Sequence, residues 1–429
     1  MQLLRFSTAG SVDDGKSTLI GRLLFDAKSI FEDQYHALVK TTARRGGVGG
    51  NVDEVMDDGV AVDLALLTDG LMAEREQGIT IDVAYRYFAT PERKFIIADT
   101  PGHEQYTRNM VTGASTADLT IVLVDAKKGV LPQSRRHAAI ASLLGIRHVV
   151  FAINKMDLVD YDQGRFETLR AELDGIAHKL GLVGVQCIPM SALRGDMVVE
   201  RGSRLDWYRG PTLLQHLEAV DVSVPREAPF RFPVQLVSRP GLPEAYVRGY
   251  MGRVESGVIR VGDRVVVQPS GRKTSVTSIV TLDGTLTEAE APQSITLLLA
   301  DEVDISRGDL ITRVETPAAA VKGFDAMVCW MDAEPMAANG RYLIKHTTRT
   351  TKALVDSIAS KLDIATLESH AVTDARLAMN EIARVRFRTR DALMIDAYAA
   401  SKATGAFIVI DEVTNHTVAA GMIVAGTQA

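Results

Sequence analysis

Apolar and polar residues follow two different rhythms along this chain, and the change of rhythm divides it into two halves. From Leu3 to about Val220, short β-branched apolar runs alternate with longer segments of helical periodicity, such as Gln133–Leu144 and Asp162–Leu180. This alternation predicts a mostly parallel sheet with helices on both faces. The predicted strands are Leu3–Thr8, Val83–Ala89, Lys94–Ala98, Leu119–Asp125, Arg147–Asn154 and Val185–Pro189.

Beyond about Val220 the helical rhythm gives way to short Val-rich runs separated by turns. The stretch "GRVESGVIRVGDRVVV" (Gly252–Val267) alternates apolar and polar residues across a short turn, which predicts a β-barrel. A second change of composition falls at Pro317–Ala320, before another strand-rich region in which Lys352–Leu362 has helical periodicity. We therefore predict an α/β domain at 1–222 and β-barrel domains at 223–316 and 317–429.

Composition and charge narrow the class of protein. The 429 residues are 46% hydrophobic and 24% charged, as in soluble globular proteins. No apolar run approaches the ~18 residues that a membrane helix needs, and the N-terminus runs directly into the first motif, without room for a signal peptide. A net charge of −6 gives no bulk attraction to nucleic acid or anionic lipid. The cysteines, Cys187 and Cys329, form no disulfide framework, so we expect a cytoplasmic protein.

The first candidate for chemistry is "GSVDDGKS", which fits the phosphate-loop pattern G-x-x-x-x-G-K-[ST]. It follows an apolar strand and precedes a helix-period run, the context in which backbone N–H groups bind phosphate oxygens. We expect Lys16 to reach the β- and γ-phosphates and the Ser17 hydroxyl to bind Mg²⁺. The predicted loop consists of Gly10, Ser11, Val12, Asp13, Asp14, Gly15, Lys16 and Ser17.

A second candidate is "KFIIADTPGH", in which a strand ends at Asp99. A carboxylate there can hold Mg²⁺ through water. The Gly102 N–H can sense the γ-phosphate, because only glycine allows so close an approach, and His103 stands where a residue can orient the attacking water. The alternative for His103 is a polar surface residue without a role. The predicted contacts in this segment are Asp99, Thr100, Pro101, Gly102 and His103.

The third candidate reads the base. In "FAINKMD" the Asp157 carboxylate can accept hydrogen bonds from guanine N1–H and the 2-amino group, which adenine does not offer. Asn154 can support the base edge, and the Lys155 stem can pack on the ring. Backbone N–H groups of "MSAL" can meet guanine O6. The predicted nucleotide is therefore GTP, read by Asn154, Lys155, Met156, Asp157, Ser191, Ala192 and Leu193.

The segment "EREQGITIDVAYRYF" contributes Thr80, between a glycine-rich stretch (Gly46–Gly50, read as a flexible insertion) and a strand. Its hydroxyl and carbonyl can complete the coordination of Mg²⁺ and the γ-phosphate, so that the segment orders with GTP. The alternative is an ordinary edge-strand threonine. We assign catalysis to His103, Lys16 and Thr80, and the metal to Ser17, Thr80 and Asp99. This first domain offers no acceptor nucleophile, which indicates a GTP-driven switch or motor.

These motifs together resemble the translation-factor class of GTPases over nearly the whole chain. One branch is closer: "GSVDDGKSTLIGRLL", "TDGLMAEREQGITIDVAYRYF", "FIIADTPGHEQYTRNMVTGASTADL", "DISRGDLI" and "KHTTRT" resemble the large, GTP-hydrolysing subunit of bacterial sulfate adenylyltransferase. Elongation factors usually carry a histidine where Asp14 stands here, which points away from translation. The resemblance implies an elongation-factor-like fold, a P-loop GTPase domain followed by two β-barrels.

The resemblance also implies partners and roles. A separate small catalytic subunit would form adenosine 5′-phosphosulfate and pyrophosphate from ATP and sulfate, for sulfate assimilation and cysteine biosynthesis. GTP hydrolysis on this chain would drive that unfavourable step. It implies a phosphate loop at Gly10–Ser17, hydrolysis through His103, and guanine reading by Asn154, Lys155 and Asp157. Because no second phosphate-loop motif occurs, we expect no kinase domain within the chain; whether Met1 and Ala429 are natural termini stays open.

Three alternatives remain at this stage. The first is a translation-type GTPase that delivers an aminoacyl-tRNA or other RNA. In "RVRFRTR", Arg384, Arg386, Arg388 and Arg390 share one strand face, which can pair with internal acids, dock an acidic partner, or, as our last choice, bind nucleic acid. The second is adenylyl transfer by the chain itself, which would need another nucleotide pocket. The third is a GTP-binding scaffold without turnover.

Overall fold

The protein is described from a computed structural model. The structure describes residues 3–28, 54–57, 60–64, 80, 82–103, 106–222, 227–238, 248–364, 366–372 and 376–427. The chain divides into two compact units, Met1–Val222 with Asp363–Glu368, and Ser223–Leu362 with Ser369–Ala429. Our expectation of a flexible insertion at Gly46–Gly50 lies outside the described residues. None of the helices in the described ranges has both the length and the apolar character that a membrane span requires.

The first unit is built on a six-stranded sheet in the order β4-β5-β1-β6-β7-β8. All neighbours are parallel except β4, which pairs antiparallel to β5. Every residue of the central strand β6 is buried, which explains its unbroken apolar run. The strands are β1 (Leu3–Ala9), β4 (Ala84–Ala89), β5 (Lys94–Asp99), β6 (Leu119–Asp125), β7 (His148–Asn154) and β8 (Gly184–Pro189).

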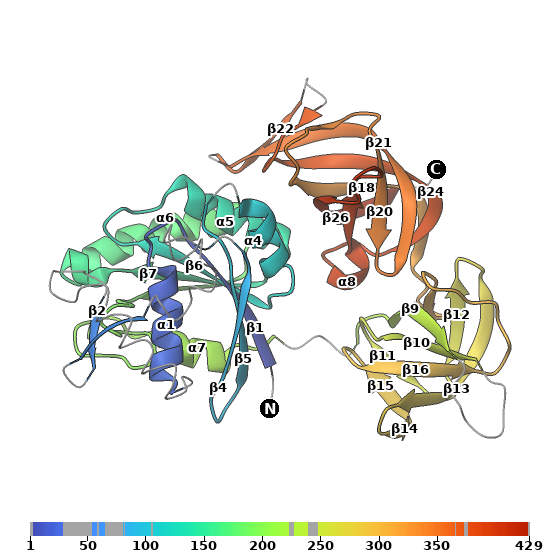
Figure 1. Cartoon of the computed structure of the whole chain (residues 1–429), viewed down its shortest axis with the longest axis horizontal. Coiled ribbons are helices and arrows are strands. Elements are labelled where there is room, and N and C mark those ends of the chain that lie inside the picture. Colours follow the sequence, from blue (N-terminus) through green and yellow to red (C-terminus); the bar gives the residue numbers. More distant parts are fainter. Residues whose placement is uncertain are drawn as a thin grey trace. The chain divides into compact units, whose positions relative to one another are not determined.

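Helices α4, α5 and α6 pack against this sheet (Figure 1). The sheet places the carboxyl ends of β1, β5, β6, β7 and β8 at one edge, where nucleotide sites of α/β folds form. The helices are α1 (Lys16–Asp26), α4 (Thr107–Ala114), α5 (Pro132–Leu143), α6 (Gln163–Lys179) and α7 (Leu213–Ala219), with a 3₁₀ turn η3 (Met156–Val159) and a separate hairpin of β2 (Glu54–Asp57) and β3 (Val60–Asp63).

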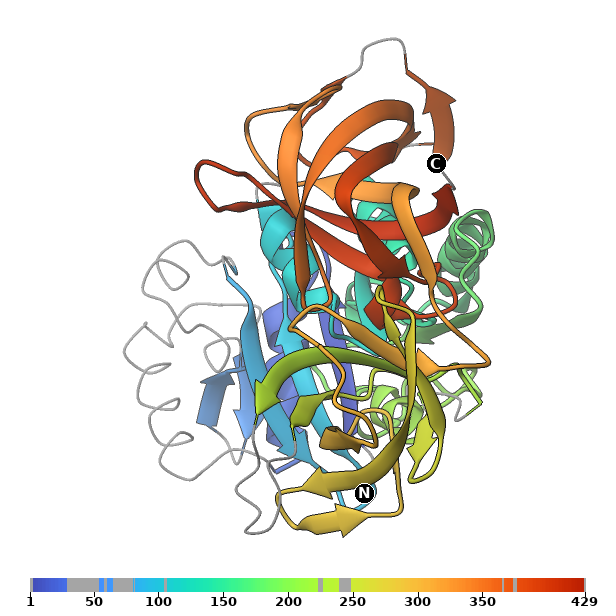
Figure 2. The same cartoon turned by 90° about the vertical axis from the view of Figure 1, so that its right-hand side faces the viewer.

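The second unit contains two closed barrels (Figure 2). In the first barrel β12, β17, β9, β10, β16 and β13 follow one another, and pairing of β13 with β12 closes the ring. Its strands are β9 (Arg231–Ser238), β10 (Gly249–Arg253), β12 (Arg264–Gln268), β13 (Arg272–Thr281), β16 (Ser294–Leu299) and β17 (Leu310–Arg313), with short β11 (Val258–Arg260), β14 (Gly284–Leu286) and β15 (Glu288–Glu290) beside them.

The second barrel closes in the same way, through pairing of β20 with β21. Inward side chains such as Phe324, Phe387 and Phe407 fill its core. Its strands are β18 (Ala319–Trp330), β20 (Arg341–His346), β21 (Arg349–Asp363), β24 (Ile382–Ile395), β25 (Ala406–Ile410) and β26 (Thr417–Thr427), with β19 (Met336–Ala337), β22 (Glu368–Ala371), β23 (Arg376–Leu377) and the short helix α8 (Lys402–Gly405).

Two sequence motifs meet where the barrels join. Arg349, in "KHTTRT", donates from Nε to the Gly308 carbonyl (2.9 Å) and from Nη2 to Asp309 Oδ1 (2.8 Å), and both acceptors belong to "DISRGDLI". Gln268 of the first barrel bonds the Ala318 backbone through its amide nitrogen and its oxygen (2.9 and 3.0 Å). The "DISRGDLI" and "KHTTRT" motifs therefore act together in holding one barrel to the other.

One expectation from periodicity is wrong. The helix-period segment Lys352–Leu362 lies within the long strand β21. Its pairing with β24 shifts register between Val355 and Ser357 and again between Ile358 and Ser360. Each shift inserts a residue into the period-2 alternation, so the apolar spacing resembles that of a helix.

The arginine face on β24 is engaged internally. Arg384 and Arg386 both bond Asp325, at 3.0 and 2.8 Å, and Arg388 pairs with Asp356. Hydrogen bonds from Arg386 outweigh burial and lower the pKa of Asp325. Of the three interpretations of "RVRFRTR", internal pairing with acids is therefore the one that the contacts favour.

Candidate functional site

The predicted phosphate loop joins β1 to α1. Gly15 has φ of 90° and Asp13 has φ of 67°, so the loop turns through left-handed conformations before the helix begins at Lys16. The first N–H groups of a helix have no intrahelical acceptor. The loop therefore has the conformation of an anion-binding site at a helix N-terminus.

Two glycines allow backbone segments to approach closely at this site. A Cβ atom on Gly102 would collide with the carbonyl oxygen of Gly10, and one on Gly15 would collide with the side-chain amide of Asn154. The segment after β5 and the last residue of β7 are thus both in contact with the phosphate loop. The structure brings together the three motifs that the sequence placed far apart.

Lys16, Asp99 and Thr80 meet at one point. The Lys16 ammonium lies 2.6 Å from Asp99 Oδ1 and 2.5 Å from Thr80 Oγ1. Lys16 is 8% exposed and Asp99 is 1% exposed, so this is a buried ion pair. Both oxygens lie beside the loop, where the sequence predicted a cation and a γ-phosphate.

Asp14 is buried within the loop. Its Oδ2 accepts a hydrogen bond from the Ser11 N–H (2.8 Å), while no partner within the described residues reaches Oδ1. Burial raises the pKa of Asp14 to about 6; the nearby Asp125 carboxylate also raises it, whereas the Ser11 hydrogen bond lowers it. The pKa of Asp14 therefore lies closer to neutral pH than that of an ordinary aspartate.

Asn154 and Lys155 connect the base-reading segment to the phosphate loop. Asn154 Nδ2 donates to the Asp14 carbonyl (2.8 Å), and its Oδ1 accepts from the Ala192 N–H (2.9 Å). The Lys155 ammonium bonds the Asp13 carbonyl and lies 3.2 Å from Asp125 Oδ2. Lys155 itself has φ of 61°. These contacts fix the distance between the phosphate end and the base end of the site.

The predicted base reader Asp157 is oriented by a hydroxyl. Ser191 Oγ donates to Asp157 Oδ1 (2.6 Å) and also accepts from the Arg194 N–H (3.2 Å). Ser191, Ala192 and Leu193 form a tight turn after β8, closed by a bridge between Ser191 and Asp196. The turn therefore lies beside Asp157, and the sequence analysis assigned both to the guanine base.

His103 is exposed at the end of the "DTPGH" segment, with its ring 6.1 Å from that of Tyr106. The neighbouring Gly102 carbonyl accepts a hydrogen bond from Gln133 Nε2 (3.0 Å), which also meets His137 Nε2 (3.1 Å). Burial lowers the pKa of His137 to about 3, so its ring stays neutral. Helix α5 thus holds the peptide that precedes His103.

Some of the residues predicted to contact the nucleotide have side chains that bond or pack within the protein instead. Thr100 Oγ1 donates to the Thr8 carbonyl (2.6 Å), and Met156 is fully buried in the core. Val12 is 39% exposed at the tip of the loop. The side chains of Thr100 and Met156 are therefore directed into the protein, and Ser17 lies half-buried in the first turn of α1.

The sequence analysis did not single out Asp125, Gln133 or Arg22. Asp125 ends the central strand β6, at the same sheet edge as Asp99, which is a signal that strand ends alone could have given. Arg22 is a buried charge inside the apolar run "LIGRLLF" of α1. A charged residue on the apolar side of a helix is uncommon and marks a specific partner. Gln133 carried no signal beyond its helix.

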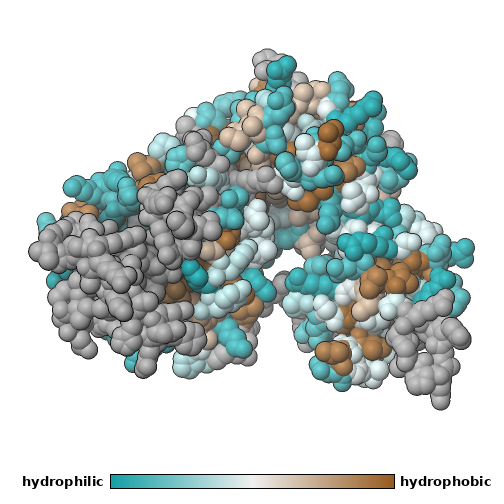
Figure 3. All heavy atoms as spheres, viewed as in Figure 1, coloured by the Kyte–Doolittle hydropathy of each residue, from teal (hydrophilic) through white to brown (hydrophobic). Residues whose placement is uncertain are grey.

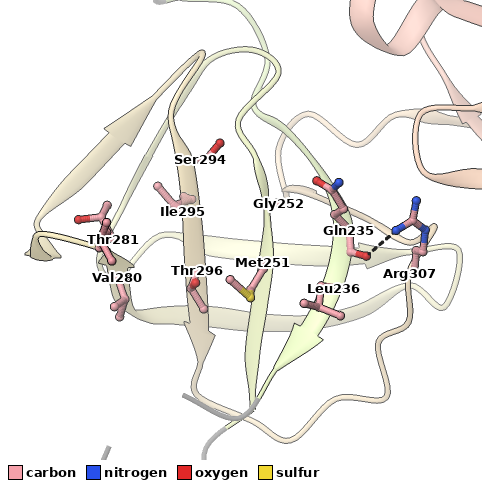
Figure 4. Close-up of a pocket in the computed structure, with 11 residues that line it drawn as sticks. Gln235, Leu236, Met251, Gly252, Val280, Thr281, Ser294, Ile295, Thr296 and Arg307 are labelled. Carbon is pink, nitrogen blue, oxygen red and sulfur yellow. Dashed lines mark hydrogen bonds between the residues drawn. The ribbon is translucent and has the colours of Figure 1, made fainter. Parts of the chain in front are cut away.

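A groove lies on the outer face of the first barrel. It matters because adenylyl transfer by this chain itself would need a second nucleotide pocket. Hydrophobic spheres gather on this barrel in Figure 3, and Figure 4 shows the groove, of about 430 Å³, over β9, β10, β13 and β16. Exposed Leu236 pairs across strands with Met251. Among the described residues that line the groove, Arg307, which donates to the Gln235 carbonyl (3.2 Å), is the only charged one. The lining residues that the structure describes form no glycine-rich cradle, which adenylyl transfer within this chain would need.

Comparison with protein families identifies the type of the first domain. The elongation factor Tu GTP-binding domain model matches residues 1–226, elongation factor Tu domain 2 matches 250–312, and the GTP-eEF1A C-terminal domain-like model matches 323–424. The predicted fold class, a P-loop GTPase domain followed by two elongation-factor-like barrels, is confirmed. The domain boundaries at 222/223 and 316/317 stay predictions.

Relatives that match over nearly the whole chain decide the family. Sulfate adenylyltransferase subunit 1 of Bacteroides fragilis is 53% identical over 423 residues, covering 98% of this chain and 86% of that protein. The chain belongs to this family. The bifunctional enzyme CysN/CysC of Mycobacterium tuberculosis is 53% identical over 424 residues, covering 98% of this chain and 67% of that protein. Membership of the sulfate adenylyltransferase subunit 1 family confirms the closer of the two resemblances seen in the sequence.

A solved structure shares the fold. The Saccharomyces cerevisiae Ski7 GTPase-like domain, bound to GDP and inorganic phosphate, gives a TM-score of 0.53 and covers 99% of this chain and 97% of that one. The two sequences are 18% identical. At that identity the likeness concerns the fold alone.

Proposed function

We propose that this chain binds GTP with Mg²⁺, hydrolyses it, and thereby drives adenylyl transfer on a separate small catalytic subunit. The products of that transfer are adenosine 5′-phosphosulfate and pyrophosphate, formed from ATP and sulfate. Membership of the sulfate adenylyltransferase subunit 1 family supports this proposal. So does the elongation factor Tu type of the first domain, which is a GTP-binding domain.

The observation that carries the proposal is the meeting of Lys16, Asp99 and Thr80. Three segments separated by up to 83 positions supply one ammonium group and two oxygens to a single point beside the phosphate loop. A hydroxyl and a carboxylate are the ligands that Mg²⁺ prefers, and an ammonium group already bridges them at 2.5 and 2.6 Å. The carboxylate and the hydroxyl fit a magnesium ion, and Ser17, in the first turn of α1, is the third ligand that we propose.

The chain's own residues divide the hydrolytic work. Lys16 binds the β- and γ-phosphates and neutralises charge that develops there. The Gly102 N–H binds a γ-phosphate oxygen, and exposed His103 orients a water molecule toward the phosphorus. When bound, Mg²⁺ would supply positive charge that neutralises the phosphates. Asp157, held by Ser191 at 2.6 Å, accepts from the guanine edge.

The proposed assembly is a heterodimer in the cytoplasm, with the adenylylation site on the small subunit. Family membership supports a subunit role, and the groove on the first barrel does not resemble a second nucleotide site. The arginines on β24 pair with acidic side chains of this chain, so they do not specifically favour the alternative of RNA delivery. It is therefore kept only as an outcome of the test.

The test is pyrophosphate release from ATP and sulfate, with this chain mixed with a purified small subunit of sulfate adenylyltransferase. We expect release to require both proteins and to rise sharply with GTP, while GDP has no such effect. Phosphate released from GTP is measured in the same samples. If GTP changes nothing and the small subunit does not bind, the proposed coupling is wrong, and RNA delivery becomes the function to test next.

A further inference from the structure

Arg22 connects the phosphate-binding helix to the loop that follows β8. It lies in the second turn of α1 and is 6% exposed. Its Nε donates to the Ala192 carbonyl (3.1 Å) and its Nη2 to the Leu193 carbonyl (2.6 Å). Nη1 bonds Asp26, four residues along the helix, at 3.3 Å. Each of the three nitrogens of this buried guanidinium thus donates a hydrogen bond, two of them to successive peptide carbonyls and one to a carboxylate.

The loop wraps around this guanidinium. Gly195, at φ of 82°, packs against Arg22, and a Cβ atom there would lie 3.6 Å from Cζ of the arginine. The Gly195 N–H donates to the Ser191 carbonyl (2.8 Å), and the Ser191 N–H donates to the Asp196 carbonyl (3.1 Å). The turn therefore closes on itself with Arg22 at its centre.

Holding a carbonyl also aims the N–H of the same peptide. In a trans peptide the C=O and the following N–H point to opposite sides. Because Arg22 holds the Ala192 carbonyl, the Leu193 N–H is directed away from α1. Within the part of the chain that the structure describes, the Leu193 N–H donates to no acceptor.

The adjoining groups of the loop are already taken. The Ala192 N–H is bound by Asn154, and the Ser191 hydroxyl is bound to Asp157. The Arg194 N–H is bound by Ser191 Oγ. Of the backbone N–H groups from Ser191 to Arg194, that of Leu193 therefore remains for a ligand.

We propose that Arg22 is a positioning residue for guanine selection, which aims the Leu193 N–H at guanine O6 by holding the carbonyls of Ala192 and Leu193. The inference rests on the proposed GTP site. It adds a residue that does not touch the nucleotide and that stands on the helix of the phosphate loop. The same side chain thus orders the far end of the site, where the base is read.

The test compares affinity for GTP and 6-thioguanosine triphosphate, which replaces O6 by a weaker acceptor and keeps N1–H, the 2-amino group and the phosphates. The wild-type chain is expected to prefer GTP roughly tenfold, the value of one hydrogen bond of ordinary strength. In Arg22→Met the loop carbonyls lose their donors, so GTP binding weakens and the preference falls to about twofold or less. Arg22→Lys, with a single ammonium group, should give an intermediate ratio.

A matched control separates positioning from general support of the fold. Arg93 is also a buried arginine, 2% exposed, whose Nη1 donates to the carbonyls of Leu217, Glu218 and Val220. Arg93→Met should lower stability and leave the ratio of the two affinities unchanged. If Arg22→Met weakens both nucleotides equally, its role is structural and the inference is wrong.

The outcomes also separate this inference from the function on which it rests. Wild-type chain that binds ATP as well as GTP would overturn the guanine site itself, and Arg22 with it. Wild-type chain that selects GTP over ATP, together with an Arg22→Met ratio equal to that of wild type, would overturn only the role of Arg22.

Discussion

Arg231 meets Asp396 through two parallel hydrogen bonds, from Nε to Oδ2 at 2.7 Å and from Nη2 to Oδ1 at 2.8 Å. Arg231 opens the first strand of the first barrel and is 4% exposed, whereas Asp396 follows β24 of the second barrel. Thr404 Oγ1 adds a third hydrogen bond to the same carboxylate (2.6 Å). This ion pair therefore links the two barrels, as the contact between Arg349 and Asp309 also does.

We expect Asp396→Asn to lower the free energy of unfolding by about 3 kcal/mol, because it leaves the Arg231 charge buried without its counter-ion. Urea denaturation of the full chain measures this. The control is Asp174→Asn, which removes an exposed carboxylate 3.7 Å from Arg170 and should cost less than about 0.5 kcal/mol. If both substitutions lower the free energy of unfolding by the same amount, the ion pair between Arg231 and Asp396 does not stabilise the chain as we expect.

The same pair predicts a dependence on acid. Burial alone would raise the pKa of Asp396, but hydrogen bonds from Arg231 and Thr404 outweigh it and hold the pKa below its usual value. A depressed pKa contributes stability above the unfolded value near 3.8, and this is lost as pH falls through the folded value. The difference between wild type and Asp396→Asn should therefore shrink below about pH 4.

Asp14 should behave in the opposite direction. Its folded pKa of about 6 exceeds the unfolded 3.8, so its ionisation lowers stability as pH rises from 4 to 6. Above pH 6 the cost is full, roughly 2 to 3 kcal/mol. Asp14→Asn, which can still accept the Ser11 N–H, should therefore stabilise the chain at pH 8 and change little at pH 4.5. A stability difference that does not vary with pH would contradict this.

His103→Ala should slow GTP hydrolysis about a hundredfold, since a positioned water-orienting group contributes on that scale, while GTP affinity stays unchanged. Single-turnover phosphate release measures the rate, and equilibrium binding measures the affinity. His178→Ala, on the exposed side of α6, is the control and should leave both unchanged. Hydrolysis at the full rate in His103→Ala would refute its assignment.

Gln133→Ala should slow hydrolysis about tenfold, because the Gly102 carbonyl loses the donor that fixes the peptide before His103. GTP affinity should change far less than the rate of hydrolysis. Gln163→Ala, at the exposed start of α6, is the matched control. A loss of affinity as large as the loss of rate would show that Gln133 supports binding instead of positioning His103.

The sequence predicted the strands of the first domain closely because their apolar runs are buried and bounded by motifs. The strand predicted at Leu119–Asp125 coincides with β6. It failed at Lys352–Leu362, where two shifts of register in β21 imitate helical spacing. Periodicity cannot separate a bulged strand from a helix, since both place apolar residues three positions apart.

For the site, too, the sequence predicted some features and missed others. Motif order brought Lys16, Asp99 and Asn154 to one edge, since parallel strands end there. The contact of Lys16 with Thr80 and the two carbonyls held by Arg22 depend on distances between segments far apart in sequence. No local pattern encodes those distances, so they had to come from the fold.

Arg93 fixes the point at which the chain leaves the first domain, at the end of α7. It stands in the turn between β4 and β5, the hairpin that separates Thr80 from Asp99, and it holds three carbonyls at the end of α7. Helix ends normally fray because their last carbonyls have no partner. Here they share a single cation, so the chain leaves the domain from an anchored point. The end of α7 is therefore tied directly to the hairpin that lies between Thr80 and Asp99 in the sequence.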